Sequence, residues 1–448
     1  MQKNLLTSPA SRTLPGDVLT PDHDGYPEAA VTMFAAGTPD LVVRPGDAAE
    51  VAAALRRAAD TGMTVSVRSG GHSLAGYGTH TDGMVIDLRR ISRVRVLDQA
   101  ARRVRVGAGA TWGAVSKAIQ PNGLAMTAGD TSSVGVGGLT LGGGIGWMVR
   151  RYGLAIDNLA AADLVTADGQ LIRADATCHE DLFWALRGGG GNFGVVVSFD
   201  FIAQPVSSVH YGTITYQDPD LPRLIAGWHE AMRVSDDNLT TTLSLVPPVM
   251  GQSGGSVLMI CYASPDRDAA EAALRPFRRL APVAGENIRV VPYAEVLEEA
   301  PPMPPGMRFE MRNTLLPGLD DAAIAAIVAL LGGGAMLALR GLGGAAARVH
   351  QDATAFAHRF AQVMVTAGAM LPPGAPPAML SEALAAWPEL SVPGAGAYIG
   401  FLGPASADPG GVASAYPPAT YRRLADVKRR YDPGNVFRRN HNIVPVGG

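Results

Sequence analysis

The chain has 448 residues, 47% apolar and 17% charged, which is enough material for buried cores in two or three domain-sized units and excludes a disordered chain. Lys plus Arg (37) nearly balance Asp plus Glu (40), so the net charge of −3 argues against binding nucleic acid through bulk charge. The two cysteines, Cys178 and Cys261, exclude a disulfide framework and a cysteine-rich metal site.

Two absences bear on where the protein works. The first 17 residues, MQKNLLTSPASRTLPGD, contain no apolar run of the kind that forms the core of a signal peptide. No stretch of about 18 residues is apolar without interruption by glycine, proline or charge, so no transmembrane helix and no membrane partner are expected. With the low cysteine content, these observations predict a cytoplasmic protein.

The first half of the chain alternates strand and helix patterns after an irregular segment at 1–40 that prolines punctuate. The capping-box spacing of Asp47 and Glu50, followed by apolar residues at helical intervals, predicts a helix that Gly62 ends. Strands are expected at 41–43, 63–67, 84–88, 93–97, 103–106, 159–166 and 195–202, and further helices at 111–119 and 181–186.

The pattern changes after Pro205, where strand-like runs are interspersed with alanine-rich amphipathic helices. The expected strands are 210–216, 240–246 and 257–262, and the expected helices are 266–280 and 320–331. This region is therefore expected to form a separate α+β unit. A basic helix with an apolar stripe follows at 421–431 and stops at Asp432-Pro433-Gly434.

The first candidate site is the loop VRSGGHS at 67–73, directly after a predicted strand. Adjacent glycines allow backbone N–H groups to turn inward and approach an anionic ligand, and Arg68 could add a charge-assisted contact. His72 would lie at the tip of the loop. A tight turn with a structurally satisfied histidine is the alternative interpretation.

The second candidate is the glycine-dense block at 127–147, TAGDTSSVGVGGLTLGGGIGW. Each glycine in a regular element costs about 0.5–1 kcal/mol, so a cluster of them favours a backbone that lies flat against a long ligand. The third candidate is the loop LRGGGGNFG at 186–194. It contains a G-x-G-x-x-G spelling, but a helix precedes it and a strand follows, which is the wrong order for a dinucleotide-binding Rossmann unit.

Other catalytic classes lack their motifs. The sequence contains no G-x-x-x-x-G-K-[ST], no G-x-S-x-G and no H-E-x-x-H, and its nine histidines include no pair with metal-ligand spacing. No metal site is therefore expected.

With the three glycine-rich blocks in this order, the chain resembles the FAD-linked oxidases of the berberine-bridge-enzyme type, within the vanillyl-alcohol-oxidase/PCMH superfamily. The stretches that carry the resemblance are VRSGGHSLAGYG (67–78), the block at 123–159, DLFWALRGGGGNFGVVVSFDF (181–201) and YRRLADVKRRYDPGNVFRRNHNI (421–443). The stretch at 340–359 is also similar to bacterial members that tailor natural products.

The resemblance implies an α+β fold in two parts. A PCMH-type FAD-binding domain would comprise residues 1–204 and be completed by 405–448, and residues 205–404 would form a substrate-binding domain with an antiparallel sheet backed by helices. The cofactor-binding positions that it implies are Arg68, Ser69, Gly70, Gly71, His72, Ser73, Ala128, Gly129, Thr131, Val134, Gly135, Gly137, Gly138, Gly142, Gly143, Gly144, Asn158, Val196, Asn440 and Asn442.

In this family the histidine of the RSGGHS loop is attached covalently to the flavin, which implies attachment through His72. Many members carry a second link through a cysteine, and the corresponding position here is Thr131. Because a threonine cannot form a thioether, a single covalent attachment is expected.

Many relatives also have a catalytic tyrosine at the end of a Y-x-N-Y stretch, where this chain has Tyr398-Ile399-Gly400-Phe401. Phenylalanine cannot take a proton, so the catalytic group must come from elsewhere. The candidates are Tyr398, His358 and Arg359, with Glu310 and Tyr211 as weaker options, and each is equally compatible with a structural role.

The activity that the resemblance implies is hydride removal from a hydroxyl-bearing carbon of a small secondary metabolite, with O2 as final acceptor and H2O2 as product. The alternatives are an oligosaccharide or alcohol oxidase of the same family, and a flavin-retaining protein that serves as a non-redox cyclase or binding module. The sequence leaves the oligomeric state open.

Overall fold

The computed structural model describes residue 14 and residues 16–248, 254–299, 307–390, 395–404 and 411–446. The expectations for residues 1–13 and for the junction at 404–405 fall wholly or partly outside these ranges. Within the described part of the chain, every helix is too short or too polar to cross a bilayer.

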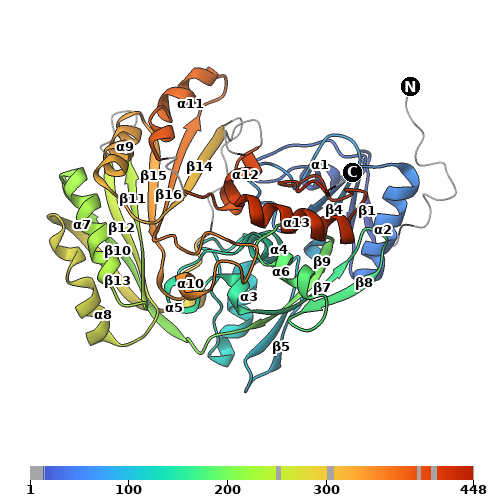
Figure 1. Ribbon diagram of the computed structural model, residues 1–448, viewed down its shortest axis with the longest axis horizontal. Coiled ribbons are helices and arrows are strands. Elements are labelled where there is room, and N and C mark those ends of the chain that lie inside the picture. Colours follow the sequence, from blue (N-terminus) through green and yellow to red (C-terminus); the bar gives the residue numbers. More distant parts are fainter. Residues whose placement is uncertain are drawn as a thin grey trace.

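The N-terminal part forms a four-stranded sheet with the order β1–β2–β4–β3, in which β1 is antiparallel to β2 and the other pairs are parallel (Figure 1). Its elements are β1 (Asp17–Leu19), α1 (Tyr26–Ala30), β2 (Leu41–Arg44), α2 (Ala48–Thr61), β3 (Val65–Arg68), β4 (Met84–Asp87) and the 3-10 turn η2 (Leu88–Arg90). The α2 helix begins as predicted, since the Asp47 side chain accepts a hydrogen bond from the Glu50 N–H, and it ends at Gly62, whose φ is 67°.

A second, antiparallel sheet has the order β5–β6–β9–β7–β8. Its strands are β5 (Val94–Asp98), β6 (Arg103–Gly107), β7 (Leu159–Val165), β8 (Leu171–Asp175) and β9 (Val195–Ile202). The helical elements between them are α3 (Trp112–Ile119), η3 (Gln120–Asn122), α4 (Val136–Gly142), α5 (Val149–Tyr152), η4 (Ala155–Asn158) and α6 (Glu180–Leu186). A helix therefore precedes the third glycine loop and a strand follows it, as the sequence predicts.

The middle of the chain forms a seven-stranded antiparallel sheet with the order β13–β10–β12–β11–β15–β16–β14. Its strands are β10 (Ser208–Tyr216), β11 (Leu239–Val246), β12 (Gly255–Tyr262), β13 (Val283–Pro292), β14 (Arg308–Leu316), β15 (Met336–Gly341) and β16 (Val363–Leu371). One face is covered by α7 (Leu221–Val234), α8 (Arg267–Leu274) and α9 (Asp321–Gly332) (Figure 1). The shorter elements are η5 (Phe277–Arg279), η6 (Tyr293–Glu295), α10 (Gly344–Arg348), α11 (Pro377–Ala383), η7 (Trp387–Leu390) and η8 (Ile399–Phe401).

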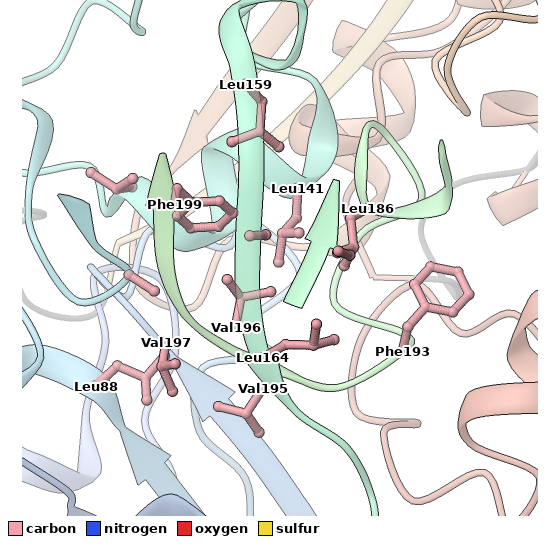
Figure 2. Close-up of a cluster of buried hydrophobic side chains, with 14 of the residues drawn as sticks. Leu88, Leu141, Leu159, Leu164, Leu186, Phe193, Val195, Val196, Val197 and Phe199 are labelled. Atoms are coloured by element: carbon pink, nitrogen blue, oxygen red, sulfur yellow. The ribbon is translucent and has the colours of Figure 1, made fainter. Parts of the chain in front are cut away.

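The chain then returns to its N-terminal half through α12 (Gly411–Ala415) and α13 (Pro418–Tyr431). Leu424, Val427 and Phe437 are buried in the same hydrophobic cluster as residues of β9 and α6. Figure 2 shows the centre of this cluster, where Leu141, Leu186 and Phe199 come from three different elements. The helix predicted at 421–431 thus packs on a core assembled more than 200 residues earlier in the chain.

The α+β class is confirmed, and two local predictions are corrected. The helix expected at 266–280 ends at Leu274, and a separate 3-10 turn follows at Phe277–Arg279. Part of the glycine-dense block, expected to be flat backbone, is the helix α4. The division of the chain after residues 204 and 404 remains our proposal, made on the positions of the three sheets.

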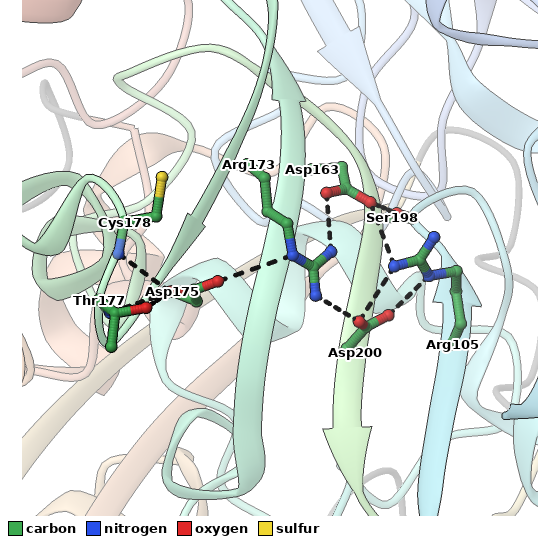
Figure 3. A network of polar contacts seen from close by, with 8 residues as sticks. All are labelled: Arg105, Asp163, Arg173, Asp175, Thr177, Cys178, Ser198 and Asp200. Carbon is green, nitrogen blue, oxygen red and sulfur yellow. Dashed lines mark hydrogen bonds and ion pairs between the residues drawn. The ribbon is translucent and has the colours of Figure 1, made fainter. Parts of the chain in front are cut away.

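A ladder of charged side chains crosses the five-stranded sheet from β6 to β8 (Figure 3). Arg105 binds Asp200 through two hydrogen bonds of 2.7 and 3.0 Å, and Arg173 contacts the same carboxylate at 2.6 Å. Arg173 also donates to Asp163 at 2.9 Å. Burial by itself raises the pKa of Asp200, but the two arginines outweigh it and hold this pKa below its ordinary value of 3.8.

We expect Asp200→Asn to lower the free energy of unfolding by about 1–2 kcal/mol at neutral pH, because both arginines lose their shared charged acceptor while staying partly solvated. A carboxylate whose pKa is depressed by folding stabilises the protein above its unfolded pKa and stops doing so as pH falls through the folded value. The difference from the wild type should therefore shrink below about pH 4 in denaturant titrations. Asp60→Asn, on the exposed side of α2, is the control and should change little; an equal loss in both variants would contradict the assignment.

Candidate active site

A cavity of about 460 Å³ lies where the three glycine-rich segments meet the C-terminal part of the chain. Its walls come from residues 67–74 and 77–78 after β3, 129–142 with α4, 190–196 before β9, 398–402 and 439–441. The seven-stranded sheet adds Phe309 and Met311 from β14. Sequence segments more than 400 residues apart, from Met33 to His441, thus surround one cavity.

The RSGGHS loop begins at the end of β3 and is fastened to the N-terminal turn of α4. A Cβ atom on Gly70 would lie 2.3 Å from the amide nitrogen of Gly135, so the two backbones touch and neither position accepts a side chain. Ser69 Oγ donates to the carbonyl of Ala108 (2.6 Å) and accepts from the N–H of Gly137 (3.3 Å). These contacts hold the loop along the cavity wall.

Arg68 reaches the cavity, but its guanidinium is engaged elsewhere. It donates to Asp87 (2.8 Å) and to the carbonyls of Ala29 (2.7 Å) and Val31 (3.2 Å). Its charge is therefore neutralised within the protein. The sequence suggested that Arg68 could contact an anionic ligand, but the side chain instead stabilises the loop.

His72 lines the cavity and forms no hydrogen bond or ion pair with the described residues. Burial lowers the pKa of its imidazole below the ordinary 6.5. The ring is therefore neutral at neutral pH, and one ring nitrogen keeps a lone pair that can act as a nucleophile.

Two glycines leave open space on the cavity side. No described atom outside the local backbone lies within 4 Å of a Cβ placed on Gly138 or Gly191, and both residues line the cavity. Since α4 tolerates side chains elsewhere, the missing side chain at Gly138 is explained by space for a ligand.

The third glycine loop is held in place by the C-terminal segment. Lys428 is fully buried, forms an ion pair with the equally buried Asp432 (2.6 Å), and donates to the carbonyls of Asn192 (2.7 Å) and Phe437 (2.9 Å). The Asn192 side chain accepts from the N–H of Ile443 (3.0 Å). An uncompensated buried ammonium would be costly, so these contacts connect the loop to α13 firmly.

The cavity wall includes most of the predicted cofactor positions. They are Arg68, Ser69, Gly70, Gly71, His72, Ser73, Gly129, Thr131, Val134, Gly135, Gly137, Gly138, Gly142, Val196 and Asn440.

Ala128, Gly143, Gly144, Asn158 and Asn442 do not line it. Gly146 packs against the Ala128 carbonyl, and the Asn158 amide bonds to the carbonyls of Tyr152 and Leu154. The Gly144 N–H donates to the hydroxyl of Tyr398, which does line the cavity.

Of the three candidate catalytic residues, Tyr398 reaches the cavity. Its hydroxyl oxygen accepts from the N–H of Gly144 (3.2 Å), and burial raises the pKa of the phenol to about 12. The phenol is thus protonated at neutral pH and is suited to donate or orient a hydrogen bond, not to act as a resting base.

His358 and Arg359 lie behind the cavity wall, which corrects the expectation that they act there. His358 Nε2 contacts the carbonyl of Ala415 (2.9 Å), and Arg359 forms a two-point ion pair with Asp157 (2.7 and 2.8 Å). Both groups are buried and committed to structural contacts. Of the weaker options, Tyr211 donates to Glu298, and Glu310 borders a separate small hollow.

The end of the cavity next to the seven-stranded sheet is apolar. Phe34 and Phe309 stack with ring centroids 6.2 Å apart, and Phe401 packs edge-on against Tyr398 at 5.2 Å. Met311 lies on the same wall. This end suits a ring-bearing apolar molecule better than a polyhydroxylated one.

Several wall residues were not predicted from the sequence, although most of them lie within the stretches that carry the family resemblance. Arg439 forms no ion pair with the described residues, and burial lowers the pKa of His441 to about 4, so that histidine is neutral. The His441 ring packs edge-on against Tyr77 (5.1 Å). A charged residue beside a run of polar ones at 438–442 was the available signal.

These features fit a flavin dinucleotide. Gly138 and Gly191 leave room for a long ligand at the backbone, and Arg439 adds a cation suited to phosphate charge. The buried Asn440 side-chain oxygen has no hydrogen-bond partner among the described residues, so it offers an acceptor to a ligand.

Comparison with known proteins agrees with this geometry. Residues 39–175 match the family described as FAD binding domain, and residues 411–444 match the family described as Berberine and berberine like. The chain is 32% identical to (R)-6-hydroxynicotine oxidase of Paenarthrobacter nicotinovorans, over 99% of both chains.

Two solved structures extend the comparison. The crystal structure of 6-hydroxy-D-nicotine oxidase from Arthrobacter nicotinovorans superposes with a TM-score of 0.87 at 29% identity, covering 98% of this chain and all of that one. Glucooligosaccharide oxidase from Acremonium strictum, which carries a 6-S-cysteinyl, 8α-N1-histidyl FAD, shares the fold with a TM-score of 0.81 at 21% identity, over 96% of each chain.

The cavity and these matches assign the protein to the FAD-dependent oxidoreductases. More narrowly, the chain belongs to the berberine-bridge-enzyme-like family of FAD-linked oxidases, within the vanillyl-alcohol-oxidase/PCMH superfamily.

We expect Gly138→Leu to abolish flavin retention, because the new side chain would occupy the cavity while the backbone of α4 accepts leucine without strain. The ratio of flavin to protein absorbance after purification measures this. Gly255→Leu is the matched control, since its position is equally open but lies on β12, away from the cavity. Full flavin content in the Gly138 variant, or equal loss in both, would contradict the placement.

Proposed function

We propose that the protein is an oxidase that carries FAD on His72 through a single covalent bond and oxidises the hydroxyl-bearing carbon of an apolar secondary metabolite. The observation that carries this proposal is the continuity of one cavity from the glycine-lined backbone around His72 to the aromatic end beside β14. When bound, FAD supplies the hydride acceptor, which O2 reoxidises with release of H2O2.

A single covalent attachment of the flavin is supported by His72 and Thr131. His72 offers a neutral imidazole on the cavity wall, which is the protonation state that covalent bond formation needs. Thr131, the position of the second link in many relatives, also lines the wall, and its hydroxyl donates to Asp130 (3.1 Å). A second covalent link, which would be a thioether, cannot form at Thr131 because this residue has no sulfur. Of the two cysteines, Cys261 is buried elsewhere and Cys178 is exposed.

The apolar end favours a ring-bearing metabolite over an oligosaccharide. Phe34, Phe309, Met311 and Phe401 supply contact area but no hydrogen-bonding side-chain group, whereas a sugar would need several. The residues of this end would hold the substrate ring and exclude water, and Tyr398 would orient the reacting group through its protonated hydroxyl.

A second candidate activity is oxidation of a carbon bonded to an amine nitrogen. It is favoured by the full-length similarity to an oxidase of hydroxynicotine, a molecule that joins an aromatic ring to a cyclic amine.

We also propose that the protein works in the cytoplasm, as expected from the sequence, and that its partners are the small-molecule substrate and O2.

We expect purified wild-type protein to stay yellow after acid precipitation, whereas His72→Ala should release its flavin into the acid supernatant or carry none. Intact-protein mass spectrometry should show one FAD on the wild type and none on the variant. His358→Ala is the control for a buried histidine off the wall and should keep acid-stable flavin in whatever folded protein is recovered. Acid-stable flavin in the His72 variant would contradict the attachment.

Turnover is tested by peroxide release with a panel of ring-bearing alcohols, ring-bearing amines and oligosaccharides. We expect the alcohols, or the amines under the second candidate, to reduce the flavin anaerobically and the oligosaccharides to leave it oxidised. Preference for oligosaccharides would overturn the substrate class. Reduction by dithionite but by no member of the panel would favour the non-redox alternative.

A further inference from the structure

One carboxylate stands in the wall of the cavity. Among the described residues that line it, Asp130 has the only carboxylate, and its side chain is 38% exposed. Asp130 directly precedes Thr131, so it lies at the part of the wall that the family resemblance associates with the flavin ring.

Arg340 holds this carboxylate from the opposite half of the molecule. Arg340 comes from β15 of the seven-stranded sheet, and its Nη2 lies 2.5 Å from Asp130 Oδ2. Its Nε donates to the hydroxyl of Thr242 (3.1 Å), and its guanidinium lies 5.2 Å from the centre of the Trp147 ring. The arginine is thus fixed from several sides and is nearly inaccessible.

The Asp130 carboxylate is charged and can accept further hydrogen bonds. Burial by itself raises the pKa of Asp130, but the charge and hydrogen bond of Arg340 outweigh it and hold this pKa below the ordinary value. A carboxylate accepts about four hydrogen bonds. Protein side chains supply two here, from Arg340 and Thr131, and the residue lines the cavity.

A purely structural ion pair between two halves would not need its acid to line the cavity. The neighbouring contact shows the difference, because Glu298 binds Tyr211 (2.7 Å) through a carboxylate that does not line the cavity. The backbone N–H of Glu298 also donates to the carbonyl of Asp130 (3.0 Å), so both acids belong to one inter-segment contact.

We propose that Asp130 anchors the substrate by accepting a hydrogen bond from the O–H or N–H⁺ group beside the carbon that is oxidised. The proposal rests on the proposed function and makes it more specific: the substrate carries a polar-hydrogen donor on an apolar ring system. A ligand without that donor would cover the carboxylate and leave it short of partners, which disfavours binding. Asp130 is thus a specificity-determining residue.

The test measures equilibrium binding calorimetrically under anaerobic conditions at mildly alkaline pH, on enzyme whose flavin has first been reduced with dithionite, so that no ligand is oxidised during the titration. The ligands are benzylamine, benzyl alcohol and toluene, which share one ring and differ in the donor. We expect Asp130→Asn to weaken binding of a donor-bearing ligand by roughly ten- to hundredfold and not to weaken binding of toluene. A larger loss for benzylamine identifies a cationic donor, and a larger loss for benzyl alcohol identifies a hydroxyl. Glu298→Gln, the matched control, should change none of the three.

Arg340→Gln supplies a second, opposite change. It removes the competing cation and leaves the carboxylate, so benzylamine should bind more tightly than to the wild type. If the pair served only to join the two halves, Asp130→Asn and Arg340→Gln would shift all three ligands in the same direction. That result, or no change in either variant, would overturn the proposal, and the arginine variant alone decides it if the asparagine variant does not fold.

Failure of this inference is separable from failure of the proposed function. Acid-stable flavin and peroxide release by the wild type test the function without reference to Asp130. A wild type that oxidises ring-bearing alcohols while Asp130→Asn binds all three ligands normally would retain the function and remove the anchor.

Discussion

The contact between Gly70 and Gly135 is the constraint on which the rest of the site depends. Two backbones approach so closely there that a Cβ on either would collide with the other, and the contact joins the loop that carries His72 to the start of α4. Ser69 reinforces it by bonding to backbone groups on both sides of that junction. The imidazole, the open face at Gly138 and the apolar side chains of Leu141 and Val196 are thereby placed in one wall. Close backbone packing at Gly70 and Gly135 and ligand space at Gly138 thus arise from neighbouring glycines of one wall.

The two halves of the molecule contribute different chemistry to one cavity. The half with the four- and five-stranded sheets contributes backbone, small residues and a neutral histidine, which suit a long planar cofactor. The seven-stranded sheet contributes Phe309 and Met311, and it sends Arg340 across to the other half. Because a buried arginine is stable only with a matched acid, the position of that sheet relative to the glycine block is set electrostatically as well as by packing.

Features that depend on local backbone geometry could be predicted from the sequence. The RSGGHS loop, the glycine block and the α2 helix were predictable, since close approach and capping leave direct traces in the residues used. The α4 helix was not, because helix propensity counts against VGGLTLG and only tertiary packing makes it helical. Strand β16 was not predicted, because the alanines and glycine of VMVTAGAML are uncommon in strands. The Asp130–Arg340 pair joins positions 210 residues apart, and no short sequence pattern predicts such a contact.

The buried ion pair of Lys428 and Asp432 has a consequence for the order of events during biosynthesis. The loop that it fastens lies at 190–194, and the segment at 439–441 adds the facing wall. A ribosome releases these last pieces long after His72 has emerged. The nascent polypeptide can form its early sheets beforehand, but it has no finished pocket to offer a cofactor until residues 439–441 have been made, so flavin attachment follows their synthesis and requires the α13 region.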